Sequence, residues 1–86
     1  MKTFPVIKEN QFVLVRAYYD SGIILDENLN VVISDEQNCY TIFNSMNEVI
    51  DYAKALVNQR GDIECNIYNS SDKPILCIDI NNYNKI

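Results

Sequence analysis

The sequence predicts an α+β fold in which one amphipathic helix packs on one face of an antiparallel sheet of about five to six strands. A single segment, residues 45–59, repeats apolar side chains with the period of a helix. Short runs rich in β-branched and aromatic residues precede and follow it. Polar turns separate these runs, which is typical of antiparallel pairing. The expected order is β-β-β-(β)-α-β-β, within one domain that spans residues 1–86.

The helix is predicted from its apolar stripe and from its ends. Its apolar positions are Met46, Val49, Ile50, Ala53, Leu56 and Val57. Ser45 can accept a hydrogen bond from a free amide of the first turn, and Glu48 three residues later completes a capping box. Gly61 is expected to end the helix by adopting a left-handed conformation.

The clearest predicted strand covers residues 11–19, and both of its faces are apolar, so we expect it to be central. Residues 23–25, 31–33 and 39–43 are expected to follow it as a meander of short strands. A hairpin after the helix would use residues 63–68 and a last strand that begins at Pro74. Residues 1–10 contain Pro5 and form either an edge strand or an arm that covers the sheet.

Composition indicates a cytoplasmic protein. No apolar run approaches the roughly 20 residues of a membrane span, and the first residues lack the apolar stretch of a signal peptide. The three cysteines, Cys39, Cys65 and Cys77, are an odd number without a C-x-x-C pair, which indicates a reducing compartment. Cys65 and Cys77 lie within strand patterns and are expected to be buried.

Charge and motifs exclude several classes of function. The net charge of −5 is opposite to that of a nucleic-acid binder. The chain has no His, the commonest general base and metal ligand, and its two glycines cannot build a phosphate-binding loop. Asp26-x-Asn28-x-Asn30 resembles the start of a calcium loop, but Val31 and Gln37 occupy the positions that need Gly and Glu. We therefore expect no catalytic residues, cofactor or metal, and no enzymatic activity.

One sheet face would remain uncovered, because a single helix covers only the other. The residues assigned to that second face are Phe12, Leu14, Tyr18, Tyr68, Ile75 and Cys77. This face is too apolar to be exposed, so we expect either the N-terminal arm or a second copy of the chain to cover it.

The predicted function is a non-enzymatic module that acts through protein contacts. We expect it to be a homodimer, with Phe12, Leu14, Tyr18, Tyr68 and Ile75 as the interface. One alternative is a small-ligand binder with a pocket between helix and sheet or at the dimer seam. Another is an acidic inhibitor or immunity-type protein with a basic partner, because residues 17–53 contain seven acids and no Lys or Arg.

The second half of the chain contains the motifs Phe43-x-Ser45-x-x-Glu48-x-Ile50-x-Tyr52-Ala53 and Ile63-Glu64-Cys65-x-Ile67-Tyr68. Together they resemble small bacterial domains of unknown function, in which a strand, a capped helix and a hairpin follow one another. The chain departs from them at Val49, where those domains have Ala, and at Ser71-Asp72-Lys73, where they have Asp-Gly. The resemblance implies the fold and provides no catalytic residues.

Overall fold

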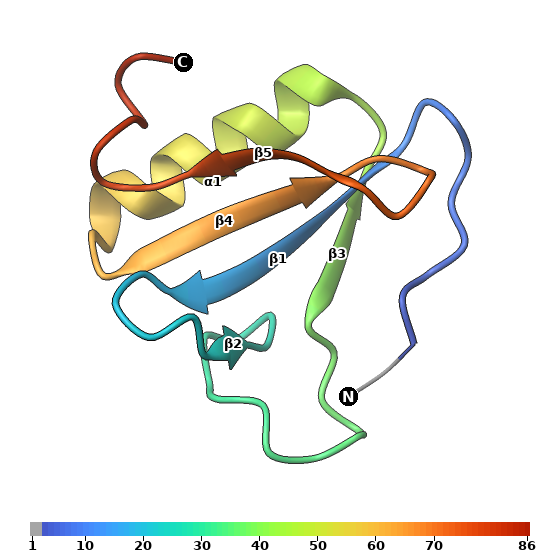
Figure 1. The fold of residues 1–86 in the computed structure, drawn as a ribbon, viewed down its shortest axis with the longest axis horizontal. Helices are drawn as coiled ribbons and strands as arrows, with labels where there is room; N and C mark the ends of the chain where they lie inside the picture. The colour runs from blue at the N-terminus through green and yellow to red at the C-terminus, as the bar shows by residue number, and fades with distance from the viewer. Residues whose placement is uncertain (1–2) are drawn as a thin grey trace.

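The computed structural model describes residues 3–86, which form one α-helix and a five-stranded antiparallel sheet (Figure 1). The elements in chain order are β1 (Phe12–Tyr18), β2 (Ile24–Leu25), β3 (Tyr40–Phe43), α1 (Met46–Gln59), β4 (Ile63–Tyr68) and β5 (Pro74–Ile78). The predicted α+β class is confirmed. None of the helical segments in residues 3–86 combines the length and the apolar character that a membrane-spanning helix requires.

Strand β1 is central, as predicted. It pairs with β4 along one side, while β3 and β2 share its other side, and β5 pairs with β4. Leu14 lies opposite Thr41 of β3 and Ile67 of β4. Arg16, two residues further on, lies opposite Leu25 of β2. The first half of β1 pairs with β3, and the second half pairs with β2 on the same side. The connection between β2 and β3 must therefore form a loop beside the sheet.

The prediction of a meander with a strand at residues 31–33 is wrong. Only one isolated bridge, between Leu25 and Val31, forms there. The backbone N–H groups of Ile33 and Ser34 instead donate to the side-chain oxygen of Gln37, at 2.7 and 3.0 Å. A side chain therefore satisfies the backbone groups that a neighbouring strand would otherwise pair.

Ser45 is the N-cap of helix α1, as predicted. The hydroxyl of Ser45 accepts a hydrogen bond from the N–H of Glu48 at 3.1 Å. The predicted role of Gly61 is wrong, because the left-handed conformation occurs at Gly22 and not at Gly61. The last hydrogen bond of the helix runs from the N–H of Arg60 to the carbonyl of Leu56. Gly61 lies close to Ile80 instead, since a Cβ at this position would be 3.1 Å from the Ile80 side chain.

The main core lies between α1 and one face of the sheet. Its fully buried residues are Leu14, Val49, Ala53, Val57, Cys65, Ile67 and Ile78, with Phe12 packed against them. The assignment of Phe12 and Leu14 to the face opposite the helix is therefore wrong, and strand alternation places Tyr18 on the helix side too. A strand that is apolar on both faces does not indicate which face the helix covers.

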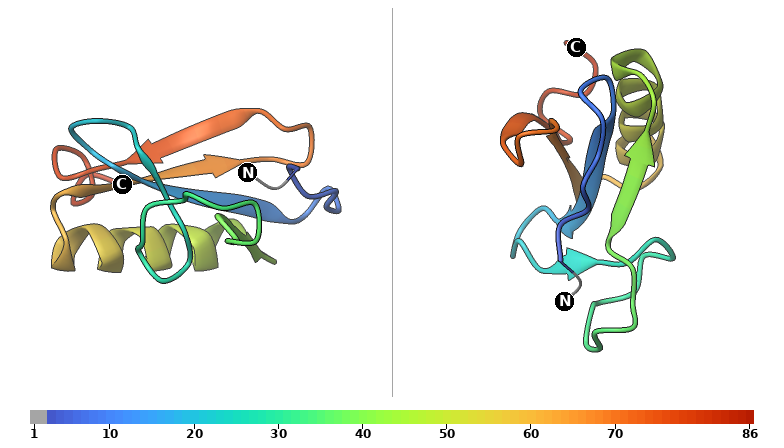
Figure 2. Two further views of the ribbon diagram at one scale, coloured as in Figure 1. Left: turned by 90° about the horizontal axis from the view of Figure 1, so that it is seen from below. Right: turned by 90° about the vertical axis from the view of Figure 1, so that its right-hand side faces the viewer.

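We call the sheet surface opposite α1 the far face. It carries Val13, Val15 and Ala17 of β1, which are all buried. Residues 3–11, here called the arm, lie on the side of the sheet away from the helix (Figure 2). The ring of Phe4 contacts both Tyr40 and Tyr68 there. Residues 3–11 thus form the covering arm and not an edge strand, while the first two positions lie outside the described residues.

Candidate functional site

A hollow of about 270 Å³ lies on the far face beside the arm. We call it the aromatic hollow, and its lining residues are Phe4, Val15, Ile24, Cys39, Tyr40, Tyr68 and Asp72. These residues come from the arm, from four different strands or their flanks, and from the turn between β4 and β5. The fold therefore gathers in one place three aromatic side chains that are distant in the sequence.

The three rings are set at steep angles to one another. The Phe4 ring centroid lies 5.5 Å from that of Tyr40 and 5.5 Å from that of Tyr68, with interplanar angles of 73° and 68°. This edge-to-face arrangement is a favourable one for aromatic pairs. Register explains why the two tyrosines share a face: Tyr40 is opposite Val15, and Tyr68 is opposite Val13.

Among the described residues that line the aromatic hollow, Asp72 is the one carboxylate. It has φ of 58°, a left-handed conformation in which Asp and Asn are the usual non-glycine residues. The side-chain oxygen of Asn69 fixes the turn by accepting from the N–H groups of Ser71 and Lys73 at 2.9 and 3.3 Å. Burial raises the pKa of Tyr40, and smaller contributions come from Cys39 and from the nearby charge of Asp72.

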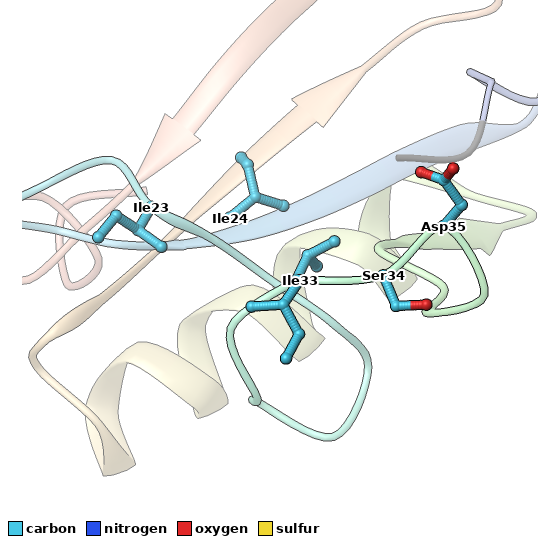
Figure 3. Close-up of a pocket in the computed structure, with 6 residues that line it drawn as sticks. Ile23, Ile24, Ile33, Ser34 and Asp35 are labelled. Carbon is cyan, nitrogen blue, oxygen red and sulfur yellow. The ribbon is translucent and has the colours of Figure 1, made fainter.

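A second hollow of about 370 Å³ adjoins the first at Ile24. We call it the isoleucine hollow, and it is lined by Ile23, Ile24, Val32, Ile33, Ser34 and Asp35 (Figure 3). The side chain of Ile33 is 89% exposed at its edge. Among the residues that the structure describes, the lining of the aromatic hollow includes Asp72 and neither Lys nor Arg, so this recess is apolar with one acidic group.

The loop that forms one wall of the isoleucine hollow is organised by Asp26, which is 6% exposed. One of its carboxylate oxygens accepts from the N–H groups of Asn28 and Asn30 at 2.8 and 2.9 Å, and the other accepts from the Gln37 amide at 2.9 Å. The hydrogen bond from Gln37, followed by the bond from Asn30, lowers the pKa of Asp26. The motif that resembles a calcium loop thus binds backbone amides, and no group of three His, Cys, Asp or Glu within residues 3–86 could hold a metal ion.

Asparagine side chains form hydrogen bonds with backbone groups at both edges of the sheet. On β3, the Asn38 side chain donates to the carbonyl of Tyr40 at 2.8 Å and accepts from its N–H at 3.2 Å. On β5, the Asn82 amide donates to the carbonyl of Cys77 at 2.8 Å. Because free backbone groups at an edge invite pairing with another strand, these caps disfavour association through the edges.

Arg16 is a buried charge on the helix side and lines neither hollow. It is 2% exposed, and its guanidinium donates to the hydroxyls of Tyr52 and Thr41 at 2.8–3.1 Å. Its Nη1 has no partner among the described residues. The guanidinium carbon lies 5.2 Å from the centre of the Tyr52 ring, so this cluster links β1, β3 and α1.

Of the predicted interface residues, Tyr68 alone lines one of these two hollows. Ile75 is also on the far face, 40% exposed on β5, whereas Phe12, Leu14 and Tyr18 are on the helix side. Sequence reasoning missed Phe4, Tyr40 and Asp72. Pro5 beside Phe4 was a signal for a covering arm. No local signal predicted that β3 pairs with β1, and it is this pairing that brings Tyr40 to the far face.

The prediction that both strand cysteines are buried is correct for Cys65 and wrong for Cys77. Cys77 points to the far face on an edge strand, where nothing packs over it completely. Burial raises the pKa of Cys65 to about 12. Although Cys77 is exposed by its surface area, partial desolvation by neighbouring groups, followed by the charge of Glu64, raises its pKa to about 11, and its thiol lies 3.6 Å from the Glu64 carboxylate.

Comparison with models of protein families, with curated proteins and with solved structures finds nothing that matches this chain. The resemblance to small bacterial domains therefore stays a prediction.

Proposed function

We propose that this chain is a non-enzymatic binding module that contacts another protein through the two hollows of its far face. The observation that carries the proposal is the aromatic hollow, an apolar recess whose described lining residues include an exposed carboxylate, Asp72, and no Lys or Arg. A segment that combines apolar and basic side chains complements such a surface in shape and in charge.

The chemistry of the lining supports recognition more than catalysis. In the aromatic hollow, Asp72 is an exposed carboxylate, and Cys39 is a thiol with no exposed surface. Catalytic acids, bases and nucleophiles normally combine access to the substrate with an environment that tunes their pKa. A location in the cytoplasm is part of the proposal, and the three free thiols support it.

Titration of the ¹⁵N-labelled protein with two matched peptides tests this function. One peptide alternates Lys with Leu, and the other alternates Glu with Leu. We expect the Lys peptide alone to shift the amide signals of β3 and of the turn that contains Asp72. Equal responses to both peptides, or shifts confined to α1, would contradict the proposal.

Two variants with the same change in net charge make the test specific. Asp72→Asn removes the carboxylate of the hollow, and Asn tolerates the left-handed conformation of that residue. Asp51→Asn removes an exposed carboxylate from α1. Asp72→Asn should weaken binding of the Lys peptide, and Asp51→Asn should leave it unchanged.

Self-association through the far face is a second candidate function. Ile42 on β3 and Ile75 on β5 are 46% and 40% exposed on this face, on strands at opposite sides of the sheet. An interface that removes about 600–800 Å² per chain would reach standard size. Sedimentation equilibrium tests it: Ile75→Asp should convert a dimer to monomers, and a wild-type monomer at tens of micromolar would rule this candidate out.

A further inference from the structure

The aromatic hollow has the components of a site for an organic cation. Tyr40, Tyr68 and Phe4 present three rings that are not stacked on one another, with angles of 73° and 68° between Phe4 and the tyrosines. A cation within about 6 Å of a ring centre is attracted by the electrons of the ring face. Rings at steep angles can contact a rounded group from several sides, which a stack cannot do.

The charges around the hollow favour a cation as well. Asp72 is among its lining residues, in a turn held by the hydrogen bonds that the Asn69 side chain accepts from Ser71 and Lys73. The remaining lining, Val15, Ile24 and Cys39, is apolar. A ligand there would lose water while it keeps one carboxylate as a counter-ion, a setting in which cation–π contacts are strongest.

The volume of the hollow indicates which kind of cation fits. An unmodified ammonium is compact and strongly hydrated, so it can pair with Asp72 but gains less than a larger cation from the rings and the apolar lining of this recess of about 270 Å³. An ammonium that carries methyl groups is larger and more weakly hydrated, and its methyl groups can pack against the rings and against Val15. Aromatic enclosures of this kind bind quaternary ammonium groups and methylated lysine.

We infer that the aromatic hollow binds a methylated ammonium group, carried by a lysine side chain of the partner protein. This inference rests on the proposed function, because it specifies which group of a basic partner enters the far face. Phe4 belongs to the arm, so the arm is part of the binding site as well as the cover of the sheet.

Choline and 3,3-dimethylbutanol provide the first test, since the two molecules have nearly the same shape and only choline is charged. We expect choline to bind about tenfold more tightly in an NMR titration, and its methyl protons to shift upfield over the ring faces. Equal affinity for the two compounds would overturn the inference.

Matched variants locate the site. Tyr68→Leu should lower choline affinity several-fold, whereas Tyr68→Phe keeps the ring and should retain binding. Asp72→Asn should lower the affinity less, because the rings remain. Tyr19→Leu removes an exposed tyrosine that does not line the hollow and should have no effect. Equal losses in Tyr68→Leu and Tyr19→Leu would also overturn the inference.

Peptides identify the source of the cation. A peptide with one trimethyllysine should bind more tightly than the same peptide with unmodified lysine, and choline should compete with it. If choline binds and the two peptides bind equally, the partner-protein part of the inference is wrong. If the Lys peptide of the first experiment binds at the far face and choline behaves like its neutral analogue, this inference fails while the proposed function stands.

Discussion

The two faces of the sheet are covered in different ways, although β1 is apolar on both. Leu14 on the helix side and Val15 on the far face are both buried. A regular helix with an apolar stripe covers the first face, and an arm without regular secondary structure covers the second. The helix gives a continuous core, whereas both hollows described above lie away from it. Burial of a strand residue therefore does not reveal whether its cover stabilises the fold or leaves room for a ligand.

Strand β4 shows the same contrast within six residues. Ile63, Cys65 and Ile67 point toward the helix and have no exposed surface. Glu64 and Asn66 point the other way, and the Asn66 amide donates to the Glu64 carboxylate at 3.0 Å. Both polar residues are only partly buried, so β4 places its apolar side chains in the core and its polar ones on the more accessible face.

The largest expected effect tests which face holds the fold together. Leu14→Ala should lower the free energy of unfolding by about 2–5 kcal/mol, because it leaves a cavity in the core under α1. Phe4→Ala removes a larger side chain but should cost less, since Phe4 is only half-buried and the arm can rearrange. Urea denaturation measures both, with Val6→Ala on the exposed part of the arm as a control. A larger loss for Phe4→Ala would mean that the arm is part of the main core.

The next effect concerns the buried charge on the helix side. Tyr52→Phe removes the hydroxyl that accepts from Nε and Nη2 of Arg16, and should cost about 1–3 kcal/mol because buried donors lose their partner. The double variant with Arg16→Met should recover stability, since it also removes the charge that needs the partner. Thermal and urea unfolding of the single and double variants provide the comparison. A neutral Tyr52→Phe would show that water reaches the guanidinium.

The helix cap is expected to contribute less. Ser45→Ala should lower the free energy of unfolding by about 1 kcal/mol, because the N–H of Glu48 loses its acceptor. Ser45→Asp keeps an acceptor at this position and should remain close to wild type. If Ser45→Ala proved more damaging than Leu14→Ala, the core on the helix side would contribute less than its burial indicates.

The helix and the central strand could be predicted because their signals are local. Ser45, Glu48 and the apolar stripe define α1 within fifteen residues of sequence, and β-branched residues on both faces mark β1 as central. No local signal shows which face of the sheet α1 covers, because both faces of β1 are apolar and either could pack against the helix.

The site on the far face depends on tertiary contacts that no pattern reports. Its aromatic hollow needs the arm to return to the sheet with Phe4, and it needs β3 to pair with β1 so that Tyr40 lies opposite Val15. The loop before β3 is held by the Gln37 side chain, which accepts from the N–H groups of Ile33 and Ser34. Asp72 itself adopts the left-handed conformation that its turn requires. The turn contains no glycine, so the sequence does not indicate which residue takes this conformation.

The smallest expected effect compares the two strand thiols, one on each face. Native protein should react with a thiol reagent at Cys77, whereas Cys65, which has no exposed surface, should react only after unfolding. Because the thiolate is the reactive form, the raised pKa of Cys77 should keep its reaction slow near neutral pH, and the reaction should become faster as the pH rises.

Glu64→Gln removes the charge that contributes to this shift, so it should increase the rate at Cys77 a few-fold at constant pH and leave Cys65 protected. Asp62→Asn, an exposed carboxylate paired with Arg60, is the matched control and should not change the rate. Equal reactivity of Cys65 and Cys77 in the folded protein would contradict the view that the helix side is closed and the far face accessible.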